Sequence, residues 1–312
     1  MKLFAFGILI LAIVIGTSTH GRHVDAALPS DKMTVEDIIA KHLESLGPNV
    51  RATKGARVIS GSTQVTFKAR GTQTSDGVAV LASDGLKSMV TMKFPSTQYP
   101  YEKIGYDGSK VTSYQLRPGD YSSLGSFVRT NPEMFKEGLL GGTLSTSWPL
   151  LDLANRKAKL EVAGTKKSGG RELIEVRYRP AGGSDLRISL FFDAETFQHV
   201  RTTYKKEIAA QMGRGGSTSR GPGGVSAAPS ASTGSGRESV GENSARQSNT
   251  IYELTEEFSD FKAEEGVTLP HSYKIRLEQI GASTQISEWT LTLAKFIFNQ
   301  HLEVSDFDVS GE

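Results

Sequence analysis

The sequence of 312 residues contains no cysteine. This absence excludes a disulfide scaffold, a thiolate metal site, a cysteine nucleophile and a lipid anchor attached to cysteine. An excess of charge of one sign is lacking too, because 36 Lys and Arg stand against 34 Asp and Glu. Nucleic-acid binders carry a strongly basic surface, so we expect no nucleic-acid partner. The remaining composition, with 37% hydrophobic residues, is that of a globular protein.

Motifs of catalysis and metal binding are also missing. The sequence has no HExxH, GxSxG, P-loop or GxGxxG motif. One acidic cluster lacks the alternating carboxylates of a calcium loop, and we interpret it as a solvated face; its members are Glu256, Glu257, Asp260, Glu264 and Glu265. We therefore predict a protein without metal or cofactor that is not an enzyme. A hydrolase whose paired acids meet only in the fold is the third alternative.

The N-terminus has the pattern of an export signal. Lys2 precedes an apolar stretch over residues 3–16, which is shorter than the roughly 20 residues of a membrane-spanning helix. Small residues at Val24 and Ala26 predict cleavage between Ala26 and Ala27. We expect residues 1–26 to be removed, and the mature chain to be exported to the periplasm as a soluble protein with 34 basic and 33 acidic residues.

The composition changes abruptly over residues 212–248, where Gly and Ser make up about half of the chain. Such a segment cannot bury enough apolar surface to offset its ordering entropy, so we predict disorder. The flanking segments, 201–210 and 249–261, both have strand character. Because loop closure entropy rises slowly with length, we interpret residues 27–312 as a single domain interrupted by this insertion.

One amphipathic helix is expected directly after the signal. Thr34 and Asp37 form a capping-box pattern, and Gly47-Pro48 stops the helix. His42 lies on the apolar face and is interpreted as a structural histidine. A second helical stretch is expected within residues 122–153, where Asn131-Pro132-Glu133 has the pattern of a helix start.

Most of the remaining sequence alternates with a period of two, which predicts an antiparallel meander of about eleven strands. Turn residues such as Ser75-Asp76-Gly77 and Asp84-Gly85 separate many of the runs. The predicted strands are residues 62–70, 77–83, 87–94, 99–106, 110–116, 158–163, 171–179, 185–192, 197–208, 250–261, 269–279 and 285–298.

The alternation predicts one dry and one wet face of a curved sheet. Arg187, Lys274 and Thr290 belong to the wet face. So many strands enclose more space than an eight-stranded barrel, so either helices plug the interior or a cavity remains. The candidate lipid-binding residues on the dry face are Val90, Met92, Phe94, Leu186, Ile188, Leu190, Phe192, Tyr273, Ile275, Leu277, Trp289, Leu291 and Leu293.

Three segments resemble the LolA/LolB-like superfamily of bacterial periplasmic lipoprotein and lipid carriers. They are the helix over residues 38–47, the Asp-Gly turn of residues 106–114, and residues 190–201 together with 265–271. The resemblance implies an unclosed antiparallel β-barrel covered by helices around an apolar cavity. It also implies a carrier, here of the soluble type because the lipidated cysteine is missing.

These observations lead to one expected function and one alternative. We expect a monomeric carrier that binds a lipid, or the acyl chains of a lipoprotein, in an apolar cavity. The alternative is a scaffold with a filled core that binds another envelope protein through residues 212–248 or a sheet edge.

Overall fold

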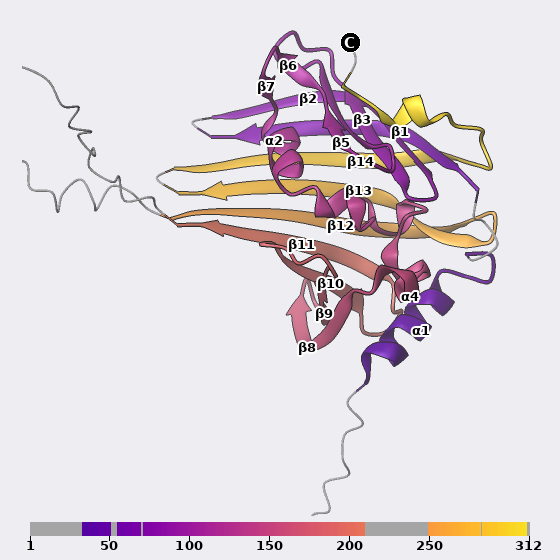
Figure 1. Cartoon of the computed structure of the whole chain (residues 1–312). Helices are drawn as coiled ribbons and strands as arrows, with labels where there is room; N and C mark the ends of the chain where they lie inside the picture. Colours follow the sequence, from indigo (N-terminus) through magenta and orange to yellow (C-terminus); the bar gives the residue numbers. More distant parts are fainter. Residues whose placement is uncertain (1–32, 51–54, 70, 210–248, 282, 311–312) are drawn as a thin grey trace, which may run out of the picture. The chain divides into compact units, whose positions relative to one another are not determined.

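In the computed structural model, twelve antiparallel strands form one sheet in the order β5-β4-β3-β2-β1-β14-β13-β12-β11-β10-β9-β8 (Figure 1). The end strands β5 and β8 each have a single neighbour, so the sheet does not close. The expected fold class, an unclosed antiparallel barrel with helices, is confirmed. The strands are β1 (Arg57–Lys68), β2 (Thr72–Asp84), β3 (Lys87–Lys93), β4 (Tyr101–Tyr106), β5 (Val111–Ser113), β8 (Lys159–Ser168), β9 (Arg171–Arg179), β10 (Arg187–Asp193), β11 (His199–Ile208), β12 (Thr250–Glu264), β13 (Val267–Ile280) and β14 (Thr284–Phe298).

The structure describes residues 33–50, 55–69, 71–209, 249–281 and 283–310. The predicted signal peptide, its cleavage site and the predicted insertion over residues 212–248 all lie outside these ranges. The elements discussed below belong to one unit of contacts that begins at Thr34.

The first hairpin differs from the prediction. Its turn lies at Ala69–Gly71, and Ser75-Asp76-Gly77 is part of β2. Cross-strand pairing explains the longer strands, because Gln64 Nε2 donates to Asp76 Oδ1 over 2.8 Å. Gly77 serves close packing instead of a turn, since a Cβ there would lie 2.2 Å from the Lys93 carbonyl oxygen.

The predicted strand 110–116 is also divided. β5 ends at Ser113, and β6 (Gln115–Arg117) pairs with β7 (Asp120–Tyr121) in a separate two-stranded sheet. This small hairpin leads the chain from the edge of the large sheet into its helical segment.

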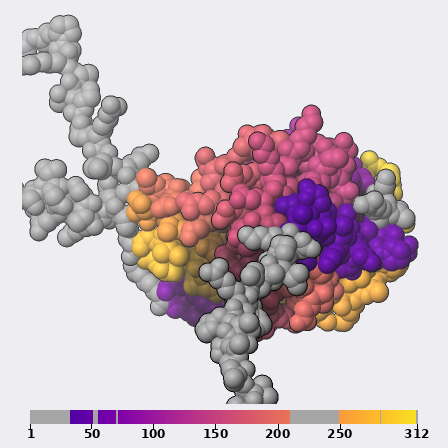
Figure 2. Space-filling model, turned by 90° about the horizontal axis from the view of Figure 1, so that it is seen from below, coloured from indigo at the N-terminus to yellow at the C-terminus, as the bar shows by residue number. Residues whose placement is uncertain are grey.

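Helix α1 (Val35–Ser45) confirms the predicted capping box. The Asp37 amide donates to Thr34 Oγ1, and the Thr34 amide donates to Asp37 Oδ2. Its buried face carries Ile38 and His42, as the apolar periodicity predicted. Figure 2 shows α1, in indigo, next to the magenta part of the chain, with which it makes contacts through η2 (Pro149–Leu151).

Residues 122–156 contain the remaining short helices and are called the cover. They comprise α2 (Ser123–Thr130), α3 (Glu133–Lys136), η1 (Gly142–Leu144), η2 and α4 (Leu153–Arg156). Helix α2 was not predicted, and it begins where Ser122 Oγ accepts a hydrogen bond from the Gly125 amide. The cover contacts β4, β5, β11 and β13, and therefore spans both halves of the sheet's dry face (Figure 1).

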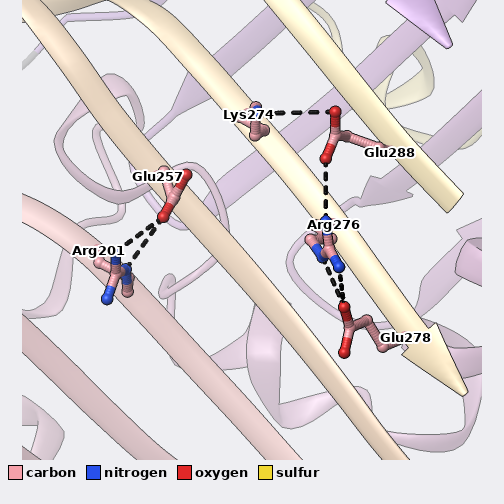
Figure 3. A network of polar contacts seen from close by, with 6 residues as sticks. All are labelled: Arg201, Glu257, Lys274, Arg276, Glu278 and Glu288. Atoms are coloured by element: carbon pink, nitrogen blue, oxygen red, sulfur yellow. Dashed lines mark hydrogen bonds and ion pairs between the residues drawn. The ribbon is translucent and has the colours of Figure 1, made fainter. Parts of the chain in front are cut away.

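The wet face carries the polar partners of the alternation. Arg201 pairs with Glu257, while Glu288 accepts from Lys274 at 3.5 Å and from Arg276 at 3.4 Å (Figure 3). The C-terminal helix η3 (Val304–Phe307) packs against β3, and Gly105 of the neighbouring β4 leaves room for the Phe307 carbonyl. The tail therefore covers one end of the wet face.

Candidate functional site: the dry face beneath the cover

The structure places the thirteen candidate residues on the dry face, and all of them are at most 6% exposed. Strand register aligns them across the sheet, as in the pairs Ile275–Trp289 and Tyr273–Leu291. The cover supplies the apolar side chains that pack on them: Leu124, Phe127, Val128, Met134, Phe135, Leu139, Leu140, Leu144, Trp148 and Leu150. The dry face and the cover together form the hydrophobic core.

Little space is left between these two layers at the β2–β3 hairpin. The pocket there, between Leu81, Val90 and the cover residues Phe135 and Leu140, has a volume of about 10 Å³. A cavity needs about 10–15 Å³ of such space to hold a single water molecule. Space for an acyl chain at this point therefore requires the cover to move.

Buried polar side chains of the sheet hold the cover in place. Arg57 of β1 is 3% exposed, and its Nη1 donates to the carbonyl oxygens of Thr143 at 2.8 Å and Leu144 at 3.1 Å. Its guanidinium also lies 5.3 Å from the ring centre of Phe298. Burial lowers the pKa of Arg57 to about 10. The two hydrogen bonds of Nη1 therefore offset only part of the desolvation cost of this charge, because the buried Nε of Arg57 has no partner among the described residues.

A carboxylate holds the middle of the cover. Glu256 Oε1 accepts from the Gly141 amide at 2.7 Å and from the Tyr273 hydroxyl, and Oε2 accepts from the Tyr204 hydroxyl at 2.7 Å. Burial raises the pKa of Glu256 to about 7. The prediction of a solvated face is therefore wrong for Glu256, because it alternates with the inward-facing Leu254 and Phe258.

A second buried carboxylate holds the start of the cover. Glu102 of β4 accepts hydrogen bonds from the Tyr99 hydroxyl and, at 2.8 Å, from Ser122 Oγ, the N-cap of α2. Trp289 Nε1 donates in turn to the Tyr99 hydroxyl over 2.9 Å. Burial raises the pKa of Glu102 to about 7. Both carboxylates thus accept from the cover across the dry face.

Two buried histidines hold the end of the cover against α1. Trp148 Nε1 donates to His42 Nε2 at 3.1 Å, so His42 Nδ1 carries the proton and donates to the Phe197 carbonyl at 3.0 Å. The neighbouring His199 has its Nε2 2.9 Å from Thr202 Oγ1 and no partner for Nδ1 within the described residues. The interpretation of His42 as a structural histidine is confirmed.

We predict that His42 makes the protein acid-sensitive. Burial lowers the pKa of His42 from 6.5 to about 4, so the unfolded chain binds the proton first. Stability is therefore lost as the pH falls from 6.5 to 4, by about 3 kcal/mol for this residue. Urea unfolding at several pH values should show a smaller acid loss in His42→Gln than in the parent. Equal losses in the two proteins would contradict the role of His42.

Sequence reasoning did not identify Arg57, Glu102 or Glu256 as site residues. Their position in the alternation could have identified them, because each charged residue occupies an inward-facing position of its strand. Glu102 alternates with Ile104 and Tyr106, which are both buried. Within the described residues, no cluster of three or more His, Cys, Asp or Glu could hold a metal ion, and a search of the same residues found no helix long and apolar enough to span a membrane.

The comparisons with known proteins concern the fold alone. No family model and no curated protein matches the sequence. The chain is similar to the structure of a LolA superfamily protein from Nitrosomonas europaea, with 10% identity and a TM-score of 0.42 over 88% of this chain and 97% of that one. A DUF1329 family protein from Desulfovibrio piger has 10% identity and a TM-score of 0.38 over the same shares.

Another similar structure is lipoprotein LppX from Mycobacterium tuberculosis. Its identity is 14% and its TM-score 0.23, over 55% of this chain and 88% of that one. The open twelve-stranded sheet and its helical cover agree with the fold that the resemblance in the sequence implied.

Proposed function

We propose that the protein is an exported, non-enzymatic carrier that binds a lipid, or the acyl chains of a lipoprotein, between the dry face and the cover. The observation that carries this proposal is how the cover is attached to the dry face of the sheet. A continuous apolar face lies under a segment that buried polar groups of the sheet fasten at separate points, among them Arg57, Glu102 and Glu256.

Burial of an acyl chain supplies free energy for displacing the cover from the dry face. Burying a methylene contributes about 0.8 kcal/mol, so twelve methylenes supply roughly 10 kcal/mol before ordering costs. An acyl chain can therefore replace the apolar contacts that the displaced cover loses. Its affinity needs no specific polar contact, which agrees with the absence of a catalytic motif.

The proposal also includes the export, the oligomeric state and the cofactor content predicted from the sequence. We expect cleavage between Ala26 and Ala27, a monomer of one domain in the periplasm, and no cofactor. The thirteen residues of the dry face would contact the acyl chain once the cover has moved.

The closely packed β2–β3 pocket favours a second candidate function, the filled-core scaffold. Its contact surface would be residues 212–248 or one of the unpaired sheet edges, β5 and β8. An edge strand presents free backbone groups that can pair with another chain.

Native mass spectrometry of residues 27–312, purified from a bacterial periplasm without detergent, separates the two functions. For a carrier we expect discrete adducts with the mass of a phospholipid or an acylated peptide. A variant that lacks residues 212–248 should keep these adducts. A bare mass that persists after titration with lipids would contradict the carrier, and loss of a protein partner on the deletion would favour the scaffold.

A further inference from the structure

The wet face is hollowed by a groove of about 860 Å³ over strands β8–β12. This volume is in the range of sites that bind small molecules. Seven lysines and arginines line the groove against two glutamates, Glu175 and Glu253. The groove lies on the opposite face of the sheet from the dry face, and the C-terminal tail packs elsewhere, against β3.

The cations at the rim of the groove are exposed and weakly paired. Arg177 Nη1 lies 3.7 Å from Glu161, and Arg187 Nη2 lies 3.4 Å from Glu207. Exposed pairs of this kind contribute little, so these groups can turn toward an incoming anion.

One arginine is oriented in advance. Arg201 Nε and Nη2 both donate to Glu257 Oε1, at 3.2 and 2.9 Å, and Nη2 also donates to Ser168 Oγ at 3.1 Å (Figure 3 shows the pairing with Glu257). The guanidinium lies 5.8 Å from the ring centre of Phe191, which is 5% exposed. Nη1 of Arg201 has no hydrogen-bond partner among the described residues.

The floor of the groove is partly apolar. Leu173 and Phe191 line it from β9 and β10. The charge of Glu175 is largely satisfied, because its oxygens accept from Lys166 Nζ and Ser189 Oγ, each at 2.8 Å. The remaining surface therefore combines cations in exposed ion pairs with buried hydrocarbon, which suits a ligand with an anionic group beside an apolar part.

We propose that this groove binds the headgroup of an anionic phospholipid. The phosphate lies among Arg177, Arg187 and Arg201, because guanidinium groups match phosphate oxygens in paired hydrogen bonds. The first acyl carbons contact Phe191 and Leu173. This site goes beyond the proposed carrier function, because it uses the opposite face and needs no movement of the cover.

Calorimetric titration of the whole protein with dihexanoyl phosphatidylglycerol, below its micelle concentration, tests the site. We expect the double variant Arg177→Glu/Arg187→Glu to bind at least about tenfold more weakly than the parent. The matched control is Lys68→Glu/Lys295→Glu, which changes the net charge equally at exposed positions outside the groove. The control should stay within about twofold of the parent, and dihexanoyl phosphatidylcholine should bind more weakly than the anionic lipid.

Other results would overturn the inference. Equal weakening in both double variants would show a general charge effect. Unchanged binding in the groove variant would place the lipid elsewhere, and would leave the carrier function intact. Inorganic phosphate or an acidic peptide binding as tightly as the lipid would show that the groove recognises charge alone.

Discussion

Lipid uptake is expected to stop when a disulfide fastens α2 to the edge strand β5. The variant Ser113→Cys/Gly125→Cys suits this purpose, because a Cβ at Gly125 would lie 2.4 Å from Ser113 Oγ. The two side chains therefore meet, and a small outward shift of α2 is needed for the disulfide to form. The chain has no cysteine of its own, so these two can pair only with each other within one molecule. If the ligand enters beneath α2, native mass spectrometry should show at least about tenfold less lipid adduct on the oxidised variant than on the reduced one.

The same sample treated with a reductant is the matched control, since it has the same sequence and lacks only the bond. The two single-cysteine variants control for the loss of Gly125 and of Ser113. Equal uptake by oxidised and reduced protein would show that α2 does not gate the ligand. Substitutions on the dry face are a weaker test. The cover buries this face in the free protein and the ligand would bury it in the complex, so such a substitution changes both folding and binding.

Replacing Glu256 with Gln is expected to stabilise the protein above neutral pH. Burial raises the pKa of Glu256 from 4.5 to about 7, so the folded state holds its proton more tightly than the unfolded chain. The stability present below pH 4.5 is therefore lost as the pH rises through 7, by about 3 kcal/mol. The amide keeps an acceptor for Gly141 and has no charge to desolvate. Glu102 has a similarly raised pKa and contributes its own loss to both proteins. Urea unfolding at pH 5 and pH 8 should therefore show a loss that is smaller in Glu256→Gln than in the parent by most of this amount.

Glu257→Gln is the matched control, because Glu257 is the next residue of β12 and lies on the wet face beside Arg201. We expect its pH dependence to follow that of the parent. Parallel curves for Glu256→Gln and the parent would mean that the three hydrogen-bond donors keep Glu256 ionised in the native state. The buried carboxylate would then be a fixed anchor of the cover with no pH dependence.

The sheet could be predicted from the sequence because the alternation of apolar and polar residues is visible within each single strand. Leu186, Ile188, Leu190 and Phe192 define an inward face without knowledge of any neighbour, and the structure confirms that all four are buried. The capping box at Thr34 was predictable for the same reason, since both of its hydrogen bonds join residues three apart. The start of β2 was not, because pairing with β1 extends this strand from Gly77 back to Thr72.

The contacts of the cover could not be predicted, because they join residues far apart in the sequence. Arg57 reaches Thr143 and Leu144 across more than eighty positions, and Gly141 reaches Glu256 across more than a hundred. Only the final packing decides which charged side chain meets a backbone group there. The groove on the wet face was hidden for a similar reason, since its cations come from separate strands and each one alone has the pattern of an ordinary exposed residue.

The gap between β5 and β8 also affects how the interior responds to its contents. Closing a sheet into a barrel fixes its strand number, stagger and diameter together. Here no ladder of hydrogen bonds joins the two edge strands, so the curvature of the sheet is free to change while every existing strand pair is kept. Under the proposed carrier function, the interior would adapt to acyl chains of different width, and selectivity among them would be graded by size without a sharp limit.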